Sequence, residues 1–293
     1  MSSSPLVPVA PGVLVATSRV MRTTTTLVVR DRSGVLVDPA WRPDELASLA
    51  DDLDALGVRV TAGVSTHPHH DHLLWHPRFG DVPRWASARA VDVVAAHRDE
   101  LRAALLAEQP AGGAVYPADV LALFGRVTPL PGTEEVGSVI PVPAPFAPSD
   151  TPDDVGTATE PGPDPDPDPD PDPDPVELIT HDAHAPGHVA VRLPARGVLL
   201  VGDMLSDVEL PLPFDPDDLP AYLAGLDVLA PHVAHATVLV PGHGTPTYEP
   251  LARLDADRRY LDDVLAGRTP DDPRLADPEM ARVHDRLVAL AEG

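Results

Sequence analysis

The sequence contains no cysteine and no lysine, and aromatic residues make up only 4% of its 293 positions. A chain without cysteine has no disulfide, no thiolate ligand for zinc and no thiol nucleophile. No apolar run approaches the ~20 residues that a membrane-spanning helix needs, and no basic segment followed by an apolar stretch opens the chain. We therefore expect a cytoplasmic protein without membrane association.

The charge is strongly one-sided. All 21 basic residues are arginines, against 46 acidic residues, and the formal net charge is −25. The alternating Asp-Pro repeat from Asp164 to Asp174 carries six of the negative charges, which leaves −19 for the remainder. Such a body repels polyanions at long range, and the sequence shows no arginine cluster that would override this. Nucleic acid is therefore not an expected partner, and we expect a small-molecule substrate.

The composition suits one large domain. Hydrophobic residues make up 43% of the chain, so a protein of this length can bury a substantial core. We predict a single domain over residues 1–293, on which a C-terminal helical extension, residues 249–293, is packed. Residues 149–175 form an insertion rich in aspartate and proline. Because proline lacks an N–H and the aspartates repel one another, we expect the insertion to be disordered and dispensable.

The order of secondary-structure signals predicts stacked sheets enclosed by helices. Short strands are expected at 13–16 and 26–29, then a helix that begins at Pro43 and ends at Gly57, and then a strand at 58–64. A long helix with Ser87 as its N-cap follows. Prolines confine the extended segments 126–130 and 138–142 to sheet edges or loops. The second half of the chain predicts strands at 189–193, 198–201 and 237–240, and helices at 217–229, 251–266 and 278–291.

A metal-type motif follows the strand at 58–64. Four histidines and one aspartate lie within the six positions from His67 to His72, and imidazole and carboxylate are the groups that zinc and similar ions prefer. His67 and His69 are two residues apart, so in an extended segment their side chains face the same way. Asp71 and His72 follow at a turn, which allows a second ion, whereas His70 should face away from the ions.

Three later sites share one pattern, in which a glycine turn precedes a metal-type ligand. These sites are Gly187-His188, Gly202-Asp203 and Gly242-His243, and the last two follow predicted strands directly. Glycine permits a sharp turn with positive φ, so each ligand would project from the edge of a sheet into a shared site. His184, shortly before His188, is a further candidate that would orient a ligand or meet the substrate.

With these motifs, the sequence resembles the metallo-β-lactamase-fold hydrolase superfamily from about Val13 to His243. The resemblance implies an α/β (α+β) fold, a four-layer αββα sandwich, with a binuclear metal site between the two sheets. Asp38 matches an aspartate that often lies beside the ligand loop in such proteins. The implied ligands are His67, His69 and His188 for the first ion, Asp71, His72 and His243 for the second, and Asp203 as the bridging carboxylate.

The implied chemistry is hydrolysis by two divalent ions, with zinc favoured and iron or manganese as options. Asp71 is expected to orient the attacking water and to pass its proton to the leaving group. We therefore predict a hydrolase that cleaves a small ester, lactone, thioester or amide. The alternatives are a phosphodiesterase or ribonuclease of the same fold, an iron-dependent oxidoreductase or dioxygenase with the same ligands, and a binding protein without catalysis. Zinc β-lactamases with a cysteine ligand are excluded.

The sequence does not assign substrate contacts. The segments most suited to form the pocket wall are 73–84 and 205–216. Their apolar side chains predict a small, partly apolar substrate; these are Leu73, Leu74, Trp75, Leu210, Leu212 and Phe214.

Overall fold

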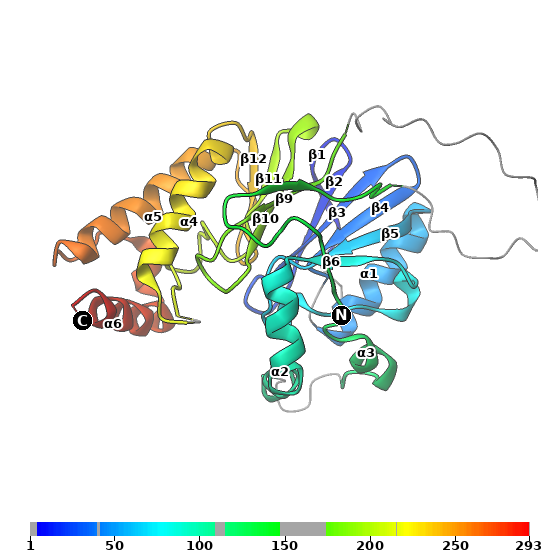
Figure 1. Cartoon of the computed structure of the whole chain (residues 1–293), viewed down its shortest axis with the longest axis horizontal. Helices are drawn as coiled ribbons and strands as arrows, with labels where there is room; N and C mark the ends of the chain where they lie inside the picture. The colour runs from blue at the N-terminus through cyan, green and yellow to red at the C-terminus, as the bar shows by residue number, and fades with distance from the viewer. Residues whose placement is uncertain (1–4, 40–41, 109–114, 147–173, 215, 293) are drawn as a thin grey trace, which may run out of the picture.

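The structure is a computed structural model that describes residues 5–39, 42–108, 115–146, 174–214 and 216–292 (Figure 1). The predicted Asp-Pro insertion, residues 149–175, lies almost entirely outside the described residues. None of the described helices is long and apolar enough to cross a membrane.

Two mixed sheets form the centre of the molecule. The first has seven strands in the order of the sequence, β1 (Val7–Ala10), β2 (Val13–Thr17), β3 (Thr24–Arg30), β4 (Ser33–Val37), β5 (Arg59–Val64), β6 (Arg84–Ala86) and β7 (Thr128–Pro129). Strands β1 to β4 are antiparallel, and β4 to β7 are parallel. The second sheet has the order β12 (Val238–Val240), β11 (Val198–Leu200), β10 (Val189–Leu193), β9 (Glu177–Thr180) and β8 (Val139–Pro141), in which only β11 and β12 pair in parallel.

Helices cover the outer face of each sheet. In Figure 1, α1 (Pro43–Leu56), α2 (Ala88–Ala107) and α3 (Ala118–Leu123) lie on one side of the sheets, and α4 (Leu219–Val233), α5 (Pro250–Leu265) and α6 (Pro278–Glu292) lie on the other. Short 3-10 helices complete the described elements: η1 (His70–His72), η2 (Pro77–Phe79), η3 (Pro194–Arg196) and η4 (Pro273–Ala276). The order helix, sheet, sheet, helix confirms the predicted αββα sandwich.

Alternation along the strands separates three apolar clusters. Val35 and Val37 of β4 face the cluster between the sheets, whereas Leu36 between them faces the cluster under α1. On the second sheet, Leu199 of β11 faces the cluster under α4, and its neighbours in the strand face inward. Because side chains alternate across a strand, both faces of these strands are buried, and aliphatic residues fill the space between the sheets.

Several local signals place their elements as expected. Gly57 ends α1 at φ +64°, and the Ser87 hydroxyl caps α2 by accepting a hydrogen bond from the backbone N–H of Ala90 at 3.1 Å. The proline-containing strands β7 and β8 are the last strands of their sheets, as the missing N–H of proline requires. In the C-terminal region, Leu254 and Leu287 pack with α4 in the outer cluster.

Candidate metal centre

The histidine motif and Asp38 lie at the ends of two adjacent parallel strands. Asp38 directly follows β4, and the loop that begins at Ser65 follows β5. Because β4 and β5 are parallel, their carboxyl ends meet at one edge of the sheet, which is where open α/β sheets place their sites. The loop then closes in η1, which carries Asp71 and His72.

The second sheet supplies the opposite half of the site. His184 lies in the connection between β9 and β10, Asp203 lies just after β11, and His243 lies just after β12. The parallel pairing of β11 and β12 brings the last two residues to the same edge. The two sheets therefore present their ligand-type side chains to one another.

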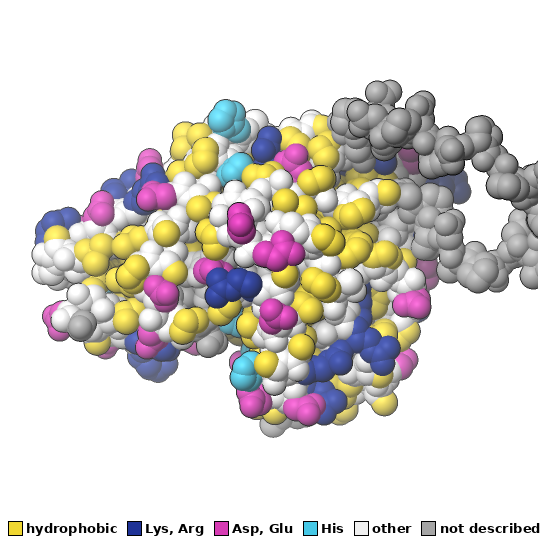
Figure 2. Space-filling model, in the orientation of Figure 1, with side chains coloured by type: hydrophobic (Ala, Val, Ile, Leu, Met, Phe, Trp, Pro, Cys, Tyr) yellow, Lys and Arg dark blue, Asp and Glu magenta, His cyan; other side chains and the backbone are white. Residues whose placement is uncertain are grey.

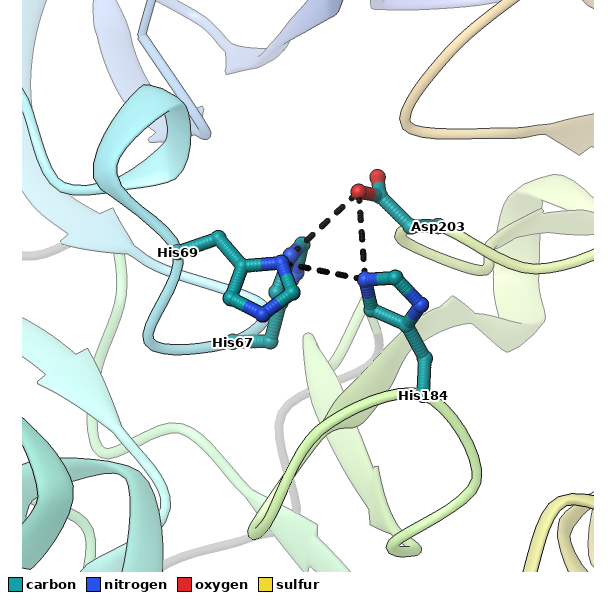
Figure 3. A group of neighbouring side chains, drawn as sticks. All are labelled: His67, His69, His184 and Asp203. Carbon is teal, nitrogen blue, oxygen red and sulfur yellow. Dashed lines mark hydrogen bonds and ion pairs between the residues drawn. The ribbon is translucent and has the colours of Figure 1, made fainter. Parts of the chain in front are cut away.

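Four of these side chains form a first group (Figure 3). The ligand atoms of His67, His69, His184 and Asp203 all lie within 4.8 Å of one another. His184 Nε2 is 3.1 Å from His69 Nδ1, and Asp203 Oδ2 is 3.3 Å from His67 Nε2 and 3.5 Å from His184 Nε2. Three imidazoles and a carboxylate thus point into one small space.

A second group lies on the other side of Asp203. Ligand atoms of Asp71, His72 and His243 also lie within 4.8 Å of one another. Asp203 Oδ1 is 3.3 Å from His72 Nε2, and Asp203 Oδ2 is 3.3 Å from His243 Nε2. Asp71 Oδ2 is 3.1 Å from His243 Nε2. Asp203 therefore contacts side chains of both groups.

The third histidine of the first group is His184, in the place expected of His188. Within the described residues, His188 belongs to neither group. It lies immediately before β10 and is fully buried, with its ring centroid 4.5 Å from that of His181. A Cβ on Gly202 would stand 2.0 Å from its Nε2, so this ring packs under the site. Among the described residues, the donor atom that completes the first group belongs to His184, four positions earlier in the chain. Both ring nitrogens of His188 are buried without a hydrogen-bond partner, so its assignment as a ligand stays a prediction.

The glycine pattern is right for two of its three members. Gly187 and Gly202 have φ of +73° and +51°, a region that side chains disfavour. Gly242 does not have a positive φ, so the expectation was wrong there. A glycine is needed at position 242 because no side chain fits there: a Cβ would stand 2.0 Å from Asp203 Oδ1.

Asp38 supports the ligand loop from behind. It accepts hydrogen bonds from the Thr66 backbone N–H at 2.9 Å and from the Thr66 hydroxyl at 2.7 Å. Its Oδ2 also lies 3.0 Å from His72 Nδ1. A carboxylate on the far nitrogen of a ligating histidine sets the orientation and basicity of the ring. His70 instead lies outside both groups, with its Nε2 3.0 Å from Glu108 Oε2.

Glu209 was missed in the sequence. It forms a third group with Asp203 and His243, and its Oε1 lies 3.9 Å from His243 Nδ1. Burial, opposed by His243 and reinforced by Asp203, raises the pKa of Glu209 to about 7. The only signal in the sequence was an acidic residue between the apolar Val208 and Leu210, which is too common to single out a site.

The electrostatics of the two groups depend on burial and on close opposite charges. Burial and the neighbouring His72 hold the pKa of His67 well below its usual value. Burial also acts against the charged form of His72, but Asp203 and Asp71 raise the pKa of this histidine well above its usual value. Asp203 in turn has a pKa well below its usual value, because His243 and His72 outweigh the effect of burial.

Unsatisfied polar atoms test whether these residues suit metal ions. His67 Nε2, His72 Nε2 and Asp203 Oδ1 are buried, and none of them has a hydrogen-bond partner among the described residues. Buried polar atoms are nearly always partnered in proteins. Nitrogen and oxygen donors that converge without hydrogen bonds are what a borderline divalent cation needs. The residues fit two such ions.

A cavity of about 550 Å³ opens beside His69. Its wall comes largely from one side of α2, including Val93, Leu101 and Ala104, and from Ala185 and Pro186 of the His184 loop. The wall is therefore largely apolar, with His97 and Glu100 as further members from α2. None of the six apolar residues named from the sequence lines it.

Leu73, Leu74 and Trp75 do not line this cavity. They are 1 to 2% exposed and pack in the cluster under α1, because the chain turns inward directly after η1.

Comparison with known proteins identifies the family of this chain. The family model of the metallo-beta-lactamase superfamily matches residues 19–243, most of the chain. The chain belongs to the metallo-beta-lactamase superfamily. The match ends at His243, the last residue of the second group, so it spans both halves of the candidate site. Members of this superfamily are generally hydrolases, and no curated protein sequence matches the chain.

Solved structures of the superfamily share the fold at low sequence identity. A beta-lactamase domain protein from Burkholderia ambifaria superposes with a TM-score of 0.60 at 18% identity, covering 99% of this chain and 88% of that one. A metallo-beta-lactamase from Pontibacter korlensis gives 0.55 at 16%, covering 85% and 94%. The DIM-1 metallo-beta-lactamase exposed to ceftazidime gives 0.51 at 15%, covering 87% and 94%. At this level of sequence identity, the similarity to these structures shows a shared fold.

Proposed function

We propose that this member of the superfamily is a hydrolase that holds two divalent metal ions and cleaves a small ester, lactone, thioester or amide. The observation that supports the proposal most directly is the position of Asp203 between two groups of ligand-type side chains. Zinc is the favoured metal, and iron and manganese suit the same nitrogen and oxygen donors. His67, His69 and His184 would hold one ion.

The second ion would be held by Asp71, His72 and His243, with Asp203 between the two. When bound, a pair of such ions lowers the pKa of a water molecule toward about 7 and polarises the oxygen of the bond to be cleaved. The protein residues around the ions would hold the ligand side chains in their orientations. Asp38 orients the His72 ring from behind through its Oδ2, 3.0 Å from His72 Nδ1.

Asp71 is the residue we assign to proton transfer. It is 6% exposed, and its Oδ2 faces His243 and His72 at 3.1 Å and 3.4 Å. A carboxylate at this point orients the attacking water and accepts its proton, which it then delivers to the leaving group. No serine or cysteine nucleophile is required.

The cavity beside His69 supports a small, partly apolar substrate. Its volume of about 550 Å³ lies within the range of ordinary small-molecule sites. Val93, Leu101 and Ala104 would contact the apolar part of the substrate, while the polar bond to be cleaved would face His69 and the metal centre.

The test is to measure bound metal and then hydrolysis. The protein, expressed with zinc and iron supplied, should contain about two ions per chain by mass spectrometry of the metals. It should hydrolyse a member of a panel of lactones, aryl esters, thioesters and amides faster than bis-p-nitrophenyl phosphate. A content well under one ion per chain would contradict the metal proposal. Preferential cleavage of the phosphodiester would overturn the substrate class.

A further inference from the structure

Three arginines from distant parts of the sequence meet in a second cavity. Arg84 at the start of β6, Arg98 in α2 and Arg126 after α3 all line a cavity of about 640 Å³. Figure 2 shows a group of arginine side chains on the visible face in the region between α2 and α3. The sequence had indicated no arginine cluster, because the cluster exists only after β6, α2 and the segment before β7 come together.

This cavity is separate from the candidate metal centre. It shares no lining residue with the cavity beside His69, although both use α2. Val91, Val94 and Arg98 line the arginine cavity, whereas Val93 and Leu101 line the other one. The two cavities therefore lie against different faces of one helix.

Backbone carbonyl groups hold two of the three guanidinium groups in place. Arg84 Nη1 donates a hydrogen bond to the Leu123 carbonyl oxygen at 2.8 Å. Arg98 Nε and Nη2 both donate to the Phe124 carbonyl oxygen, at 2.9 Å and 2.7 Å. These neighbouring carbonyls lie at the end of α3, so the two arginines are fixed beside each other before any ligand arrives. The Arg126 side chain makes no hydrogen bond or ion pair within the described chain, and only its backbone N–H is bonded, to the Leu123 carbonyl oxygen at 3.2 Å.

The three arginines have no carboxylate partner among the described residues, in contrast to Arg78 and Arg286, which each pair with aspartate. Asp81 is the only acidic side chain on the wall. Burial, together with the positive charges of Arg126 and Arg98, lowers the pKa of Arg84 to about 10, against the opposing effect of Asp81. In a protein with a net charge of −25, this is a local excess of positive charge with preorganised donors.

We propose that the arginine cavity binds a small phosphate monoester. Guanidinium groups present parallel N–H donors that match phosphate oxygens, and arginine is favoured wherever such bidentate recognition is needed. The volume of about 640 Å³ is more than a phosphate group fills, and Val91, Val94 and Val127 supply an apolar surface for the organic part of the ligand. The strong negative charge elsewhere disfavours a nucleic acid strand, because long polyanions are repelled.

Phenyl phosphate is the probe that tests this, since it joins a dianionic phosphate to a small apolar ring. Isothermal titration of the metal-loaded protein should show a site that Arg126→Ala and Arg98→Ala each weaken at least tenfold. Arg126→Lys, which keeps the charge and loses the planar fork, should fall in between. Arg282→Ala, an exposed arginine of α6, is the matched control and should bind as the unaltered protein does.

Phosphate can also bind at a metal centre, so two further arms separate the sites. The same titration with His184→Ala should retain the arginine-dependent site. Benzoate, which carries a carboxylate on the same ring, should bind at least tenfold more weakly than phenyl phosphate. Equal binding by the Arg126→Ala and Arg98→Ala variants would overturn the proposal, as would loss of all binding in His184→Ala. Equal affinity for benzoate would overturn the assignment to phosphate.

The Arg126 side chain is exposed and makes no hydrogen bond or ion pair with another described residue, so its replacement should not unfold the protein. Thermal unfolding of Arg126→Ala should match that of Arg282→Ala. If the binding loss appears only in Arg98→Ala, together with a lower melting temperature, the site is not an anion site and the proposal fails.

Discussion

Arg274 Nη1 donates a hydrogen bond to the backbone carbonyl oxygen of Glu209 at 2.8 Å, across 65 residues of sequence. The same nitrogen donates to the Ser206 carbonyl at 3.0 Å, and the Ser206 hydroxyl donates to the His243 carbonyl at 2.7 Å. The C-terminal region, through η4, thus holds the loop that follows Asp203. This arrangement connects the helices outside the matched family region to the geometry of the candidate metal centre.

Replacing Arg274 should therefore destabilise the protein strongly. Arg274 pairs with Asp257 at 2.7 Å, and Asp257 is 1% exposed. Arg274→Met leaves that carboxylate buried without its partner, which typically costs about 3–5 kcal/mol. Urea unfolding followed by circular dichroism measures the change. Arg258→Met breaks an exposed pair with Asp227 and should cost less than about 1 kcal/mol. Similar losses in both variants would show that the buried pair contributes no more than a surface one.

Replacing His184 and His188 by alanine, one at a time, tests which of the two histidines binds a metal ion and which only packs beside the site. His184→Ala should remove close to one ion per chain, because His184 Nε2 lies among the donor atoms of the first group. His188→Ala should retain both ions and lower the melting temperature, since its ring is fully buried beside His181. The measurement is the number of metal ions that each variant retains after dialysis. Loss of an ion in His188→Ala alone would restore the assignment implied by the family resemblance.

Asp71→Ala should abolish nearly all turnover while the fold remains intact. Removal of a positioned acid–base group costs about 100- to 10,000-fold in rate. Asp71 is buried, but it lies in the short η1 turn and not in a strand or long helix of the core. The measurement is kcat/KM on the best substrate of the panel, with circular dichroism to check folding. Activity within a few-fold of the unaltered protein would rule out the proton-transfer role.

Gly242→Ala should damage the metal centre more than the fold. An added Cβ would stand 2.0 Å from Asp203 Oδ1, so the bridging carboxylate must move and both ions should bind more weakly. Gly57→Ala is the matched control, because Gly57 has a φ of +64° and nothing within 4 Å of its Cβ position. The control should cost about 1 kcal/mol of stability through backbone strain and leave metal affinity unchanged. Competition with a chromogenic chelator measures the affinities, and equal values in both variants would contradict the steric argument.

Much of the fold could be predicted because its signals are local. The helix from Pro43 to Gly57, the N-cap at Ser87 and the edge positions of the proline-containing strands all depend on a few neighbouring residues. Ligand-type side chains after a strand were also visible, since their identity and their spacing are written in consecutive positions. Asp38 was picked out only through the family resemblance, because an aspartate directly after a strand is equally typical of a turn.

The choice between His184 and His188 could not be made in this way. Both follow a strand signal and both are imidazoles, and the difference lies in how the His184 loop crosses the edge of the second sheet. Leu73 and Trp75 were misplaced for a similar reason, because an apolar residue beside a ligand loop suits a pocket wall and a core equally well. The direction of the chain after η1 buries them.

The arginine cavity shows the same limit most clearly. Arg84, Arg98 and Arg126 are isolated from one another in the sequence, where each reads as one more charge on a solvated surface. The packing of α2 against β6 and the chain before β7 brings them together, and the carbonyl groups of Leu123 and Phe124 hold two of them there. A local sequence pattern shows which chemical groups a short segment carries. Which groups from distant segments share one space depends on how the sheets and helices pack.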